Sequence, residues 1–425
     1  MGQYRERIAD KLLKEQLEAS GAVLIEGPKW CGKTTTAEQQ AKSRLYMNDP
    51  EAEDEIMLMA NTSIGRLLKG NTPRLIDEWQ MVPRLWDAIR FEVDHRENNT
   101  GQFILTGSAV PASTEQIHHS GAGRFGWLTM RPMTLWESGE STGEVSLQAL
   151  FRGESVDAES AGIDIERLAY LCCRGGWPAS ISMSRDAALR QAYNYIDAVC
   201  NTDISRVDGI RREASFCHRL LRSYARHSGT PATLSTLYND LVANEAESLS
   251  EATISSYLQA LRKIFVIEDM PAWNPNLRSK SAVRVSDTRY FVDSSIAAAS
   301  LGLGPDDLID DLRTLGFIFE TLAVRDLRVY ANAIGGDVFH FRDRNGLECD
   351  VVVHLRNGHY GLIEIKLGGE KLIDEGAKAL NSLANKIDTE KMKAPTFKMV
   401  LTGLGKYCYV REDGVFVVPI SSMQP

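Results

Sequence analysis

The sequence predicts a multidomain α/β protein in which a parallel sheet is followed by a mainly helical region and a second, strand-rich unit. Its 425 residues correspond to roughly three domains of ~150 residues. Hydrophobic residues make up 43% and charged residues 25%, close to globular averages. From Gly21 to about Met130, short apolar runs alternate with helical stretches. Such alternation is typical of parallel strands joined by helices.

The predicted strands of this first region are AVLI (22–25), RLYM (44–47), RLI (74–76), FILT (103–106) and FGWLTM (125–130). Residues 132–205 have a mostly helical pattern. Between about Val207 and Leu301, several helices precede two strand-like segments, KIFVIEDMPAW and VRVSDTRYFVD. The remainder is predicted to begin with a helix (Leu312–Tyr330) and to continue in strands: DVFHFR, LECDVVVHL, YGLIEIKL, TFKMVLTG and GVFVVPI.

Composition excludes several classes of protein. The net charge of -9 argues against a protein that coats nucleic acid through bulk charge, although it allows a local basic surface. No run reaches the ~18 apolar residues that a membrane span needs, and the N-terminal stretch lacks the apolar core of a signal peptide. Seven cysteines without a CxxC pair indicate reduced thiols. We therefore expect a cytoplasmic protein that does not contact membranes.

A phosphate-binding loop is predicted at residues 27–34, GPKWCGKT, which match GxxxxGK[ST] through Gly27, Gly32, Lys33 and Thr34. The motif follows a predicted strand and begins a helix. Glycines let backbone N–H groups surround a phosphate, and the helix N-terminus adds partial positive charge. We expect Lys33 to reach the β- and γ-phosphates of ATP and the Thr34 hydroxyl to bind Mg²⁺.

Acidic and polar residues follow two further strands of this region. LIDEWQ places Asp77 and Glu78 after an apolar strand, where one acid can hold Mg²⁺ and its neighbour can orient the attacking water. Ser108, at the end of FILTGS, is a candidate contact for the γ-phosphate or the water, or simply part of a tight turn. Arg124 in GAGRFGW is either a transition-state cation, within one subunit or across an interface, or a surface arginine.

With these motifs the chain resembles bacterial and archaeal AAA-type ATPases of the ASCE class that carry a C-terminal domain of unknown function, DUF4143. The resemblance covers nearly the whole chain and also includes GRFGWLTMRPMTLWE and RGGWPASI (174–181). It implies that nucleotide binds at Gly27, Gly32, Lys33, Thr34, Thr35, Asp77, Glu78 and Ser108. Trp30 and Cys31 depart from the family, which often has smaller or polar residues there.

A basic segment lies in the middle of the chain, with a charge of +4 between Ile204 and Thr230. Four of its arginines have the spacing of one helical face: Arg212, Arg219, Arg222 and Arg226. Two amphipathic helices and the two strand-like segments then suggest a winged helix-turn-helix. Thr253, Ser256 and Gln259 would face a DNA major groove, or the module would serve only as a protein–protein spacer.

The C-terminal strands contain Asp350 and the triplet Glu364-Ile365-Lys366, the D…(D/E)xK spacing of metal-dependent nucleases. Whether Asp350 joins Glu364 depends on the hairpin loop between them. A two-residue Asn-Gly loop pairs Asp350 with Ile365, whereas a three-residue loop with Gly358 in the left-handed region pairs it with Glu364. Only the three-residue loop assembles a site for Mg²⁺ on Asp350 and Glu364.

Glu320 lies inside an apolar helical run, GFIFETLAV, where an acid needs a partner or a polar pocket. In nucleases of this fold the first core helix often supplies a glutamate, so Glu320 is a candidate fourth member of the set. The alternative is that ExK is an exposed charge pair and Glu320 only borders the helix.

We therefore expect an AAA-type ATPase core (1–131), a helical lid (132–205), a winged-helix module (206–301) and a restriction-endonuclease-like DUF4143 domain (302–425). The leading interpretation is an ATPase that uses ATP and Mg²⁺ and acts on nucleic acid, with DNA and further copies of the chain as candidate partners. The alternative is a nucleotide-dependent switch or scaffold. Its C-terminal domain would be catalytically inert and would serve docking or DNA binding.

Overall fold

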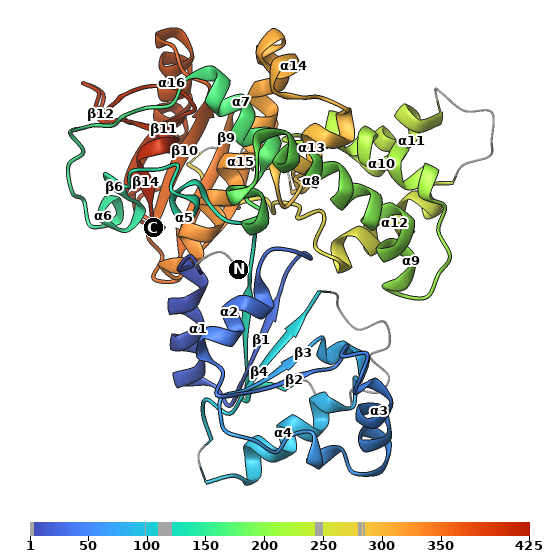
Figure 1. Cartoon of the computed structure of the whole chain (residues 1–425). Coiled ribbons are helices and arrows are strands. Elements are labelled where there is room, and N and C mark those ends of the chain that lie inside the picture. Colours follow the sequence, from blue (N-terminus) through green and yellow to red (C-terminus); the bar gives the residue numbers. More distant parts are fainter. Residues whose placement is uncertain (1–3, 98, 109–120, 243–249, 279–282, 284) are drawn as a thin grey trace. The chain divides into compact units, whose positions relative to one another are not determined.

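The structure, a computed structural model, describes residues 4–97, 99–108, 121–242, 250–278, 283 and 285–425 (Figure 1). The chain divides into two compact units. The first comprises Met1–Pro132, Asn201–Glu213 and Tyr257–Val266; the second comprises Met133–Cys200, Ala214–Ser256 and Ile267–Pro425. Within the described residues, every helix is too short or too polar to cross a lipid bilayer.

A five-stranded parallel sheet forms the centre of the first unit, as the sequence predicts (Figure 1). Its spatial order is β2-β3-β4-β1-β5, and every neighbouring pair is parallel. The strands are β1 (Ala22–Glu26), β2 (Ser43–Tyr46), β3 (Arg74–Asp77), β4 (Phe103–Gly107) and β5 (Phe125–Thr129). Because all five strands run the same way, their carboxyl ends meet at one edge of the sheet.

Helices cover both faces of this sheet, and its central strands β1 and β4 are accordingly buried along almost their whole length. The side chains of β1 alternate between the two faces. Val23 and Ile25 join the core that includes residues of α1 (Ile8–Ala19) and α2 (Lys33–Gln40). Ala22 and Leu24 join the core that includes residues of α3 (Glu53–Thr62) and α4 (Leu85–His95).

The second unit begins with the helices that the sequence predicts, together with two short strands that it does not, β6 (Val145–Ser146) and β7 (Ala158–Glu159). Two antiparallel bridges, Ile267–Phe291 and Met270–Thr288, join the two segments that the sequence suggests as a wing. The helices are α5 (Leu135–Ser138), α6 (Leu147–Phe151), α7 (Ile165–Arg174), α8 (Arg185–Ala198), α10 (Ala214–Arg226), α11 (Leu234–Val242), α13 (Ser294–Leu301) and α14 (Pro305–Asp310); α12 (Glu251–Lys263) continues into the first unit.

The predicted four-arginine helical face is wrong at one position. Helix α10 begins at Ala214, so Arg212 precedes it. The Arg212 side chain is buried, and its guanidinium contacts the Asp208 carboxylate at 2.7 Å. Its spacing relative to Arg219 fits a helix, but the chain is not yet helical at Arg212 and Glu213. Arg219 and Arg222 are exposed on α10.

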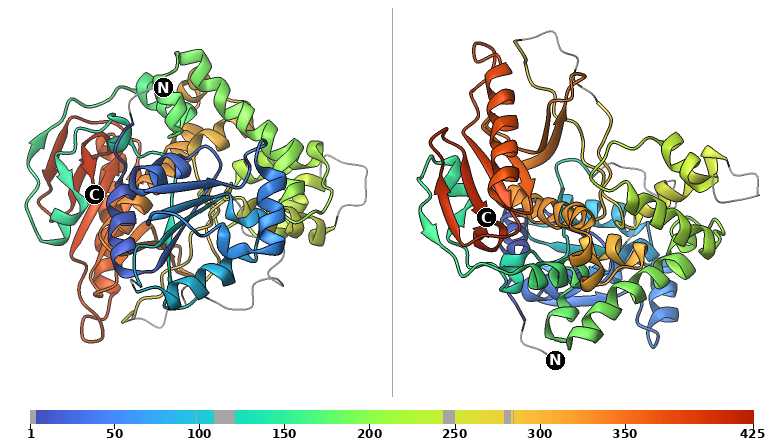
Figure 2. Two further views of the ribbon diagram at one scale, coloured as in Figure 1. Left: turned by 60° about the horizontal axis from the view of Figure 1, so that its bottom comes forward. Right: turned by 90° about the horizontal axis from the view of Figure 1, so that it is seen from above.

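A seven-stranded sheet forms the C-terminal part of the second unit, in the order β7-β12-β13-β11-β10-β9-β8. It follows the long helix α15 (Leu312–Ala333), and α16 (Glu370–Lys386) connects the parallel strands β10 and β11 (Figure 2). The strands are β8 (Gly336–Arg342), β9 (Glu348–Leu355), β10 (Tyr360–Lys366), β11 (Phe397–Thr402), β12 (Tyr407–Val410) and β13 (Phe416–Pro419). Strand β12 was not predicted.

A buried ion-pair network joins the helices of the second unit. The Arg325 guanidinium of α15 lies 2.8 Å from Asp293 Oδ2 and 2.7 Å from Asp326 Oδ1, and all three side chains are almost inaccessible to water. The backbone N–H of Leu135 donates to Asp326, and that of Gly176 donates to Asp293. Each buried carboxylate therefore has both a charged partner and a hydrogen-bond donor.

This network explains the glycines of RGGWP. A Cβ on Gly176 would lie 2.1 Å from the carbonyl oxygen of Met133 and 2.8 Å from Arg325. Gly175 has φ +70°, which favours glycine. The Trp177 indole N–H then donates to Ser295 Oγ at the start of α13. The motif is required for packing within the second unit.

Replacing Arg325 with methionine should lower the free energy of unfolding by about 3–5 kcal/mol, because two buried carboxylates lose their counter-charge. Arg313 is exposed on the same helix. The matched variant Arg313→Met should change the stability by roughly 0.5 kcal/mol or less. Urea unfolding of both variants measures the difference, and equal stabilities would contradict the importance of the network.

Candidate functional site

The loop at residues 27–34 connects β1 to α2 and depends on two glycines. Gly27 has φ +151° and Gly32 has φ +100°. A Cβ on Gly27 would lie only 2.0 Å from the carbonyl oxygen of Met130. The loop therefore passes against the backbone beyond β5 so closely that only glycine fits at its first position. Helix α2 begins at Lys33 and directs its free N–H groups toward the loop.

Lys33 is buried against this loop. Its ammonium donates to the carbonyl oxygens of Gly27, at 2.9 Å, and Pro28, at 2.7 Å. Thr35, in the first turn of α2, is exposed. The ammonium and the helix N-terminus thus concentrate positive charge around the loop, which suits a polyphosphate.

The two residues that depart from the family occupy different environments. Trp30 has φ +67° and is 47% exposed, so its ring does not fill the loop. Cys31 is fully buried, and its Sγ lies 3.6 Å from the carbonyl oxygen of Met130. Arg7, which sequence reasoning missed, donates to the carbonyl oxygens of Cys31 and Arg131, each at 2.9 Å. These contacts support the loop without occupying it.

Thr34 and Asp77 meet at the carboxyl edge of the sheet. The Thr34 hydroxyl donates to Asp77 Oδ1 at 2.7 Å, and the Thr106 hydroxyl donates to the same oxygen. A hydroxyl and a carboxylate are oxygen ligands of the kind that Mg²⁺ accepts beside the phosphates of a nucleotide. The residues present therefore fit a magnesium ion held between α2 and β3.

Glu78 follows directly on β3 and has φ +57°, an unusual conformation for a residue with a side chain. Its Oε2 accepts a hydrogen bond from Ser108 Oγ at 3.1 Å and another from the Gln80 side chain. The structure thus brings Ser108 to Glu78, and it adds Gln80. The amide oxygen of Gln80 is buried and makes no hydrogen bond within the described residues. Left-handed backbone of this kind is often found at functional sites.

Arg124 lies away from these residues. It immediately precedes β5, and its carbonyl oxygen accepts from the N–H of Ala22, the first residue of β1. It is therefore at the amino edge of the sheet, one strand length from the phosphate loop. Its guanidinium pairs with Asp94 at 2.8 Å. A role at the loop of the same chain is wrong for this geometry, and a role across a subunit interface stays a prediction.

The hairpin between β9 and β10 has the three-residue loop that a C-terminal site requires. Leu355 pairs with His359, and Gly358 has φ +81°. The ladder then pairs Val353 with Gly361 and Val351 with Ile363. Continued by one residue, this register places Asp350 opposite Glu364, on the same face of the sheet.

Lys366 bridges the two acids. Its ammonium lies 2.6 Å from Glu364 Oε2 and 3.2 Å from Asp350 Oδ2, while Asp350 also accepts from the N–H of Ile365 at 2.8 Å. Burial, followed by the Asp350 charge, raises the pKa of Glu364 to about 8. The two carboxylates raise the pKa of Lys366 against the effect of burial. The ammonium is thus held as the counter-charge of two crowded acids.

Glu320 belongs to the same electrostatic environment. Burial and the Asp350 carboxylate raise the pKa of Glu320 to about 8. Its Oε1 accepts a hydrogen bond of 2.5 Å from the hydroxyl of Tyr290, which sequence reasoning missed because Tyr290 lies in a different segment. Among the described residues, no group of three or more histidine, cysteine and acidic side chains is arranged to hold a metal ion. Asp350 and Glu364 instead hold Lys366.

The helix expected to face DNA has the predicted polar side. Thr253 and Gln259 of α12 are exposed and Ser256 is partly exposed, whereas Ile254 and Leu258 are buried. On α10, Arg226 pairs with Asp240 at 2.7 Å. The described residues thus present polar side chains on α12 and exposed arginines on α10.

Three family models match parts of the chain. An AAA domain matches residues 19–138, a domain of unknown function (DUF8612) matches residues 165–307, and a domain of unknown function (DUF4143) matches residues 315–423. Two curated relatives, the uncharacterized proteins Rv2008c of Mycobacterium tuberculosis and Mb2031c of Mycobacterium bovis, are each 24% identical over 363 residues. The match covers 85% of this chain and 73% of each relative.

Two solved structures also show likeness. The Walker-type ATPase PABY2304 of Pyrococcus abyssi has a TM-score of 0.42 at 14% identity, over 69% of this chain and 94% of that one. The Orc1 protein of Aeropyrum pernix, solved in complex with DNA, has a TM-score of 0.23 at 14% identity. The match covers 73% of this chain and 95% of that one. The chain combines an AAA domain with a C-terminal DUF4143 domain, as its motifs predict.

Proposed function

We propose that this protein hydrolyses ATP in the presence of Mg²⁺ at the carboxyl edge of the first sheet. The observation that carries the proposal is the direct contact between Thr34 and Asp77, beside Glu78 and Ser108. Four residues from α2, β3 and the end of β4 converge there although they are far apart in sequence. A chance glycine-rich turn would not be accompanied by this set.

Each residue of the site has a chemical role in the proposal. Lys33 and the N–H groups of α2 would bind the phosphates, and Thr34 and Asp77 would hold the ion. Bound Mg²⁺ would supply positive charge that offsets the charge developing during phosphoryl transfer. Glu78, oriented by Ser108 and Gln80, would align the attacking water and accept its proton.

Replacing Glu78 with glutamine should lower kcat for ATP hydrolysis by about 100-fold or more while nucleotide binding is retained, because the amide cannot accept a proton. Glu15 is exposed on α1, and Glu15→Gln serves as the matched control. Phosphate release and binding of a fluorescent ATP analogue measure the two effects. Unchanged hydrolysis in Glu78→Gln would refute the role given to Glu78.

Nucleotide binding should be lost in Gly27→Ala, because the new Cβ collides with the backbone at Met130. Gly65 provides the control, since a Cβ there meets nothing within 4 Å and its φ is not positive. Titration with the same fluorescent analogue compares the two variants. Equal affinities would show that the loop does not bind the phosphates in this conformation.

A second candidate function, metal-dependent cleavage of nucleic acid, is favoured by the register that unites Asp350, Glu364 and Lys366. Cation binding would require Lys366 to release at least one carboxylate, after which Glu320 would complete the acidic set.

We extend the proposal to the whole chain with the boundaries expected from sequence: ATPase core, helical lid, winged-helix module with α12 toward DNA, and restriction-endonuclease-like domain. An inert C-terminal domain that serves docking is the alternative.

Cleavage of single- and double-stranded DNA and RNA with Mn²⁺ or Mg²⁺ tests the second candidate. Lys366→Ala should abolish cleavage, whereas Lys371→Ala, at an exposed position of α16, should leave it unchanged. Absence of cleavage by the unaltered protein with and without ATP would leave only the docking alternative. The ATPase proposal would be unaffected by that outcome.

A further inference from the structure

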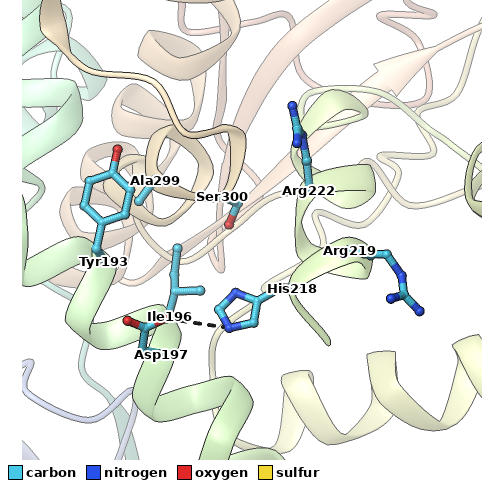
Figure 3. A pocket seen from close by; sticks show the side chains of 8 residues that line it. All are labelled: Tyr193, Ile196, Asp197, His218, Arg219, Arg222, Ala299 and Ser300. Atoms are coloured by element: carbon cyan, nitrogen blue, oxygen red, sulfur yellow. Dashed lines mark ion pairs between the residues drawn. The ribbon is translucent and has the colours of Figure 1, made fainter. Parts of the chain in front are cut away.

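A pocket of about 270 Å³ lies within the second unit, among α8, α10 and α13 (Figure 3). Its polar lining comprises Tyr193 and Asp197 of α8, His218, Arg219 and Arg222 of α10, and Ser300 of α13. None of these residues belongs to the loop at residues 27–34 or to the carboxylates of β9 and β10. The pocket falls in the segment matched by the domain of unknown function DUF8612.

Positive charge dominates the lining. Arg219 and Arg222 are one helical turn apart on α10, and both are exposed. Arg222 forms no hydrogen bond or ion pair within the described part of the chain. The single acid among the residues that line the pocket, Asp197, lies 3.6 Å from His218 Nε2. Two guanidinium groups, with an imidazole ring nitrogen as a further hydrogen-bonding group, suit an anion with more than one oxygen.

Ser300 supplies an independent sign of a missing partner. Its hydroxyl oxygen is buried and makes no hydrogen bond within the described residues. The hydroxyl of a serine in a helix can ordinarily donate a hydrogen bond to a backbone carbonyl oxygen one turn earlier. In Figure 3 the Ser300 hydroxyl instead points into the space between α8 and α10. A buried hydroxyl without a partner is unfavourable, and an oxygen of a bound ligand would satisfy it.

The remaining wall is apolar. Ile196 and Ala299 line the pocket beside the ring of Tyr193. We propose that this pocket binds a phosphate group, held by Arg222, His218 and Ser300, with the organic part of the ligand against Ile196 and Tyr193. The phosphate belongs either to a free nucleotide or to a nucleic-acid strand, since both present the same oxygens to the pocket.

The test uses the full chain carrying Lys33→Ala, so that the ATP site does not contribute. Calorimetric titration compares three probes: inorganic phosphate, AMP and an eight-residue single-stranded oligonucleotide. Arg222→Gln in this background should weaken binding about tenfold or more, because a hydrogen bond between charged groups is lost. Ser300→Ala should weaken it in the same direction. Arg190→Gln, on an exposed part of α8, should have no effect.

The probes also identify the source of the phosphate. Binding of AMP without the oligonucleotide indicates a nucleotide site, and binding of the oligonucleotide without AMP indicates a strand. Both outcomes support the proposal if Arg222→Gln weakens them. Binding that Arg222→Gln and Arg190→Gln leave equal would overturn it, as would absence of binding by all three probes. Circular dichroism of the two arginine variants ensures that both remain folded.

Discussion

The proposed nucleotide site depends on one constraint, the common direction of five strands. Strands β1, β3 and β4 all end at the same edge. The backbone alone therefore brings together the loop after β1, Asp77 and Glu78 at the end of β3, and Ser108 after β4. Their side chains then need only short hydrogen bonds to one another. The two apolar cores on the faces of the sheet hold this edge in place, so the chemistry of the site rests on packing some distance from it.

The C-terminal carboxylates are assembled by a different means. Antiparallel strands place side chains opposite each other. Whether the loop between two such strands has two or three residues therefore decides which side chains meet. Gly358 permits the three-residue loop, and Asp350 therefore lies opposite Glu364. Two carboxylates that share one largely buried lysine repel each other, and the Lys366 ammonium between them relieves the repulsion. The same lysine is thus the stabilising partner of the acids and the group with which a metal ion would compete.

Local pattern was sufficient to predict the first sheet, because the helices α2, α3 and α4 alternate with the short strands β1 to β4. It was also sufficient to state which hairpin loop would unite Asp350 and Glu364. It failed where the outcome depends on distant packing. Arg212 has helical spacing to Arg219 but precedes the helix and is buried with Asp208. For Arg124 the sequence left three roles open, and the structure places it at the opposite edge of the sheet from the loop of the same chain. Arg7 and Tyr290 contact the sites from segments without any motif, and Gln80 contacts Glu78 from within LIDEWQ without having been singled out.

Phosphate release from ATP by the full-length protein, measured with and without Mg²⁺ and beside Lys33→Ala, tests the central claim most directly. We expect hydrolysis that requires Mg²⁺ and is lost in Lys33→Ala, because this ammonium lies against the backbone of the loop, at the carbonyl oxygens of Gly27 and Pro28. Hydrolysis that persists in Lys33→Ala, or failure of the unaltered protein to bind and hydrolyse ATP, would contradict it.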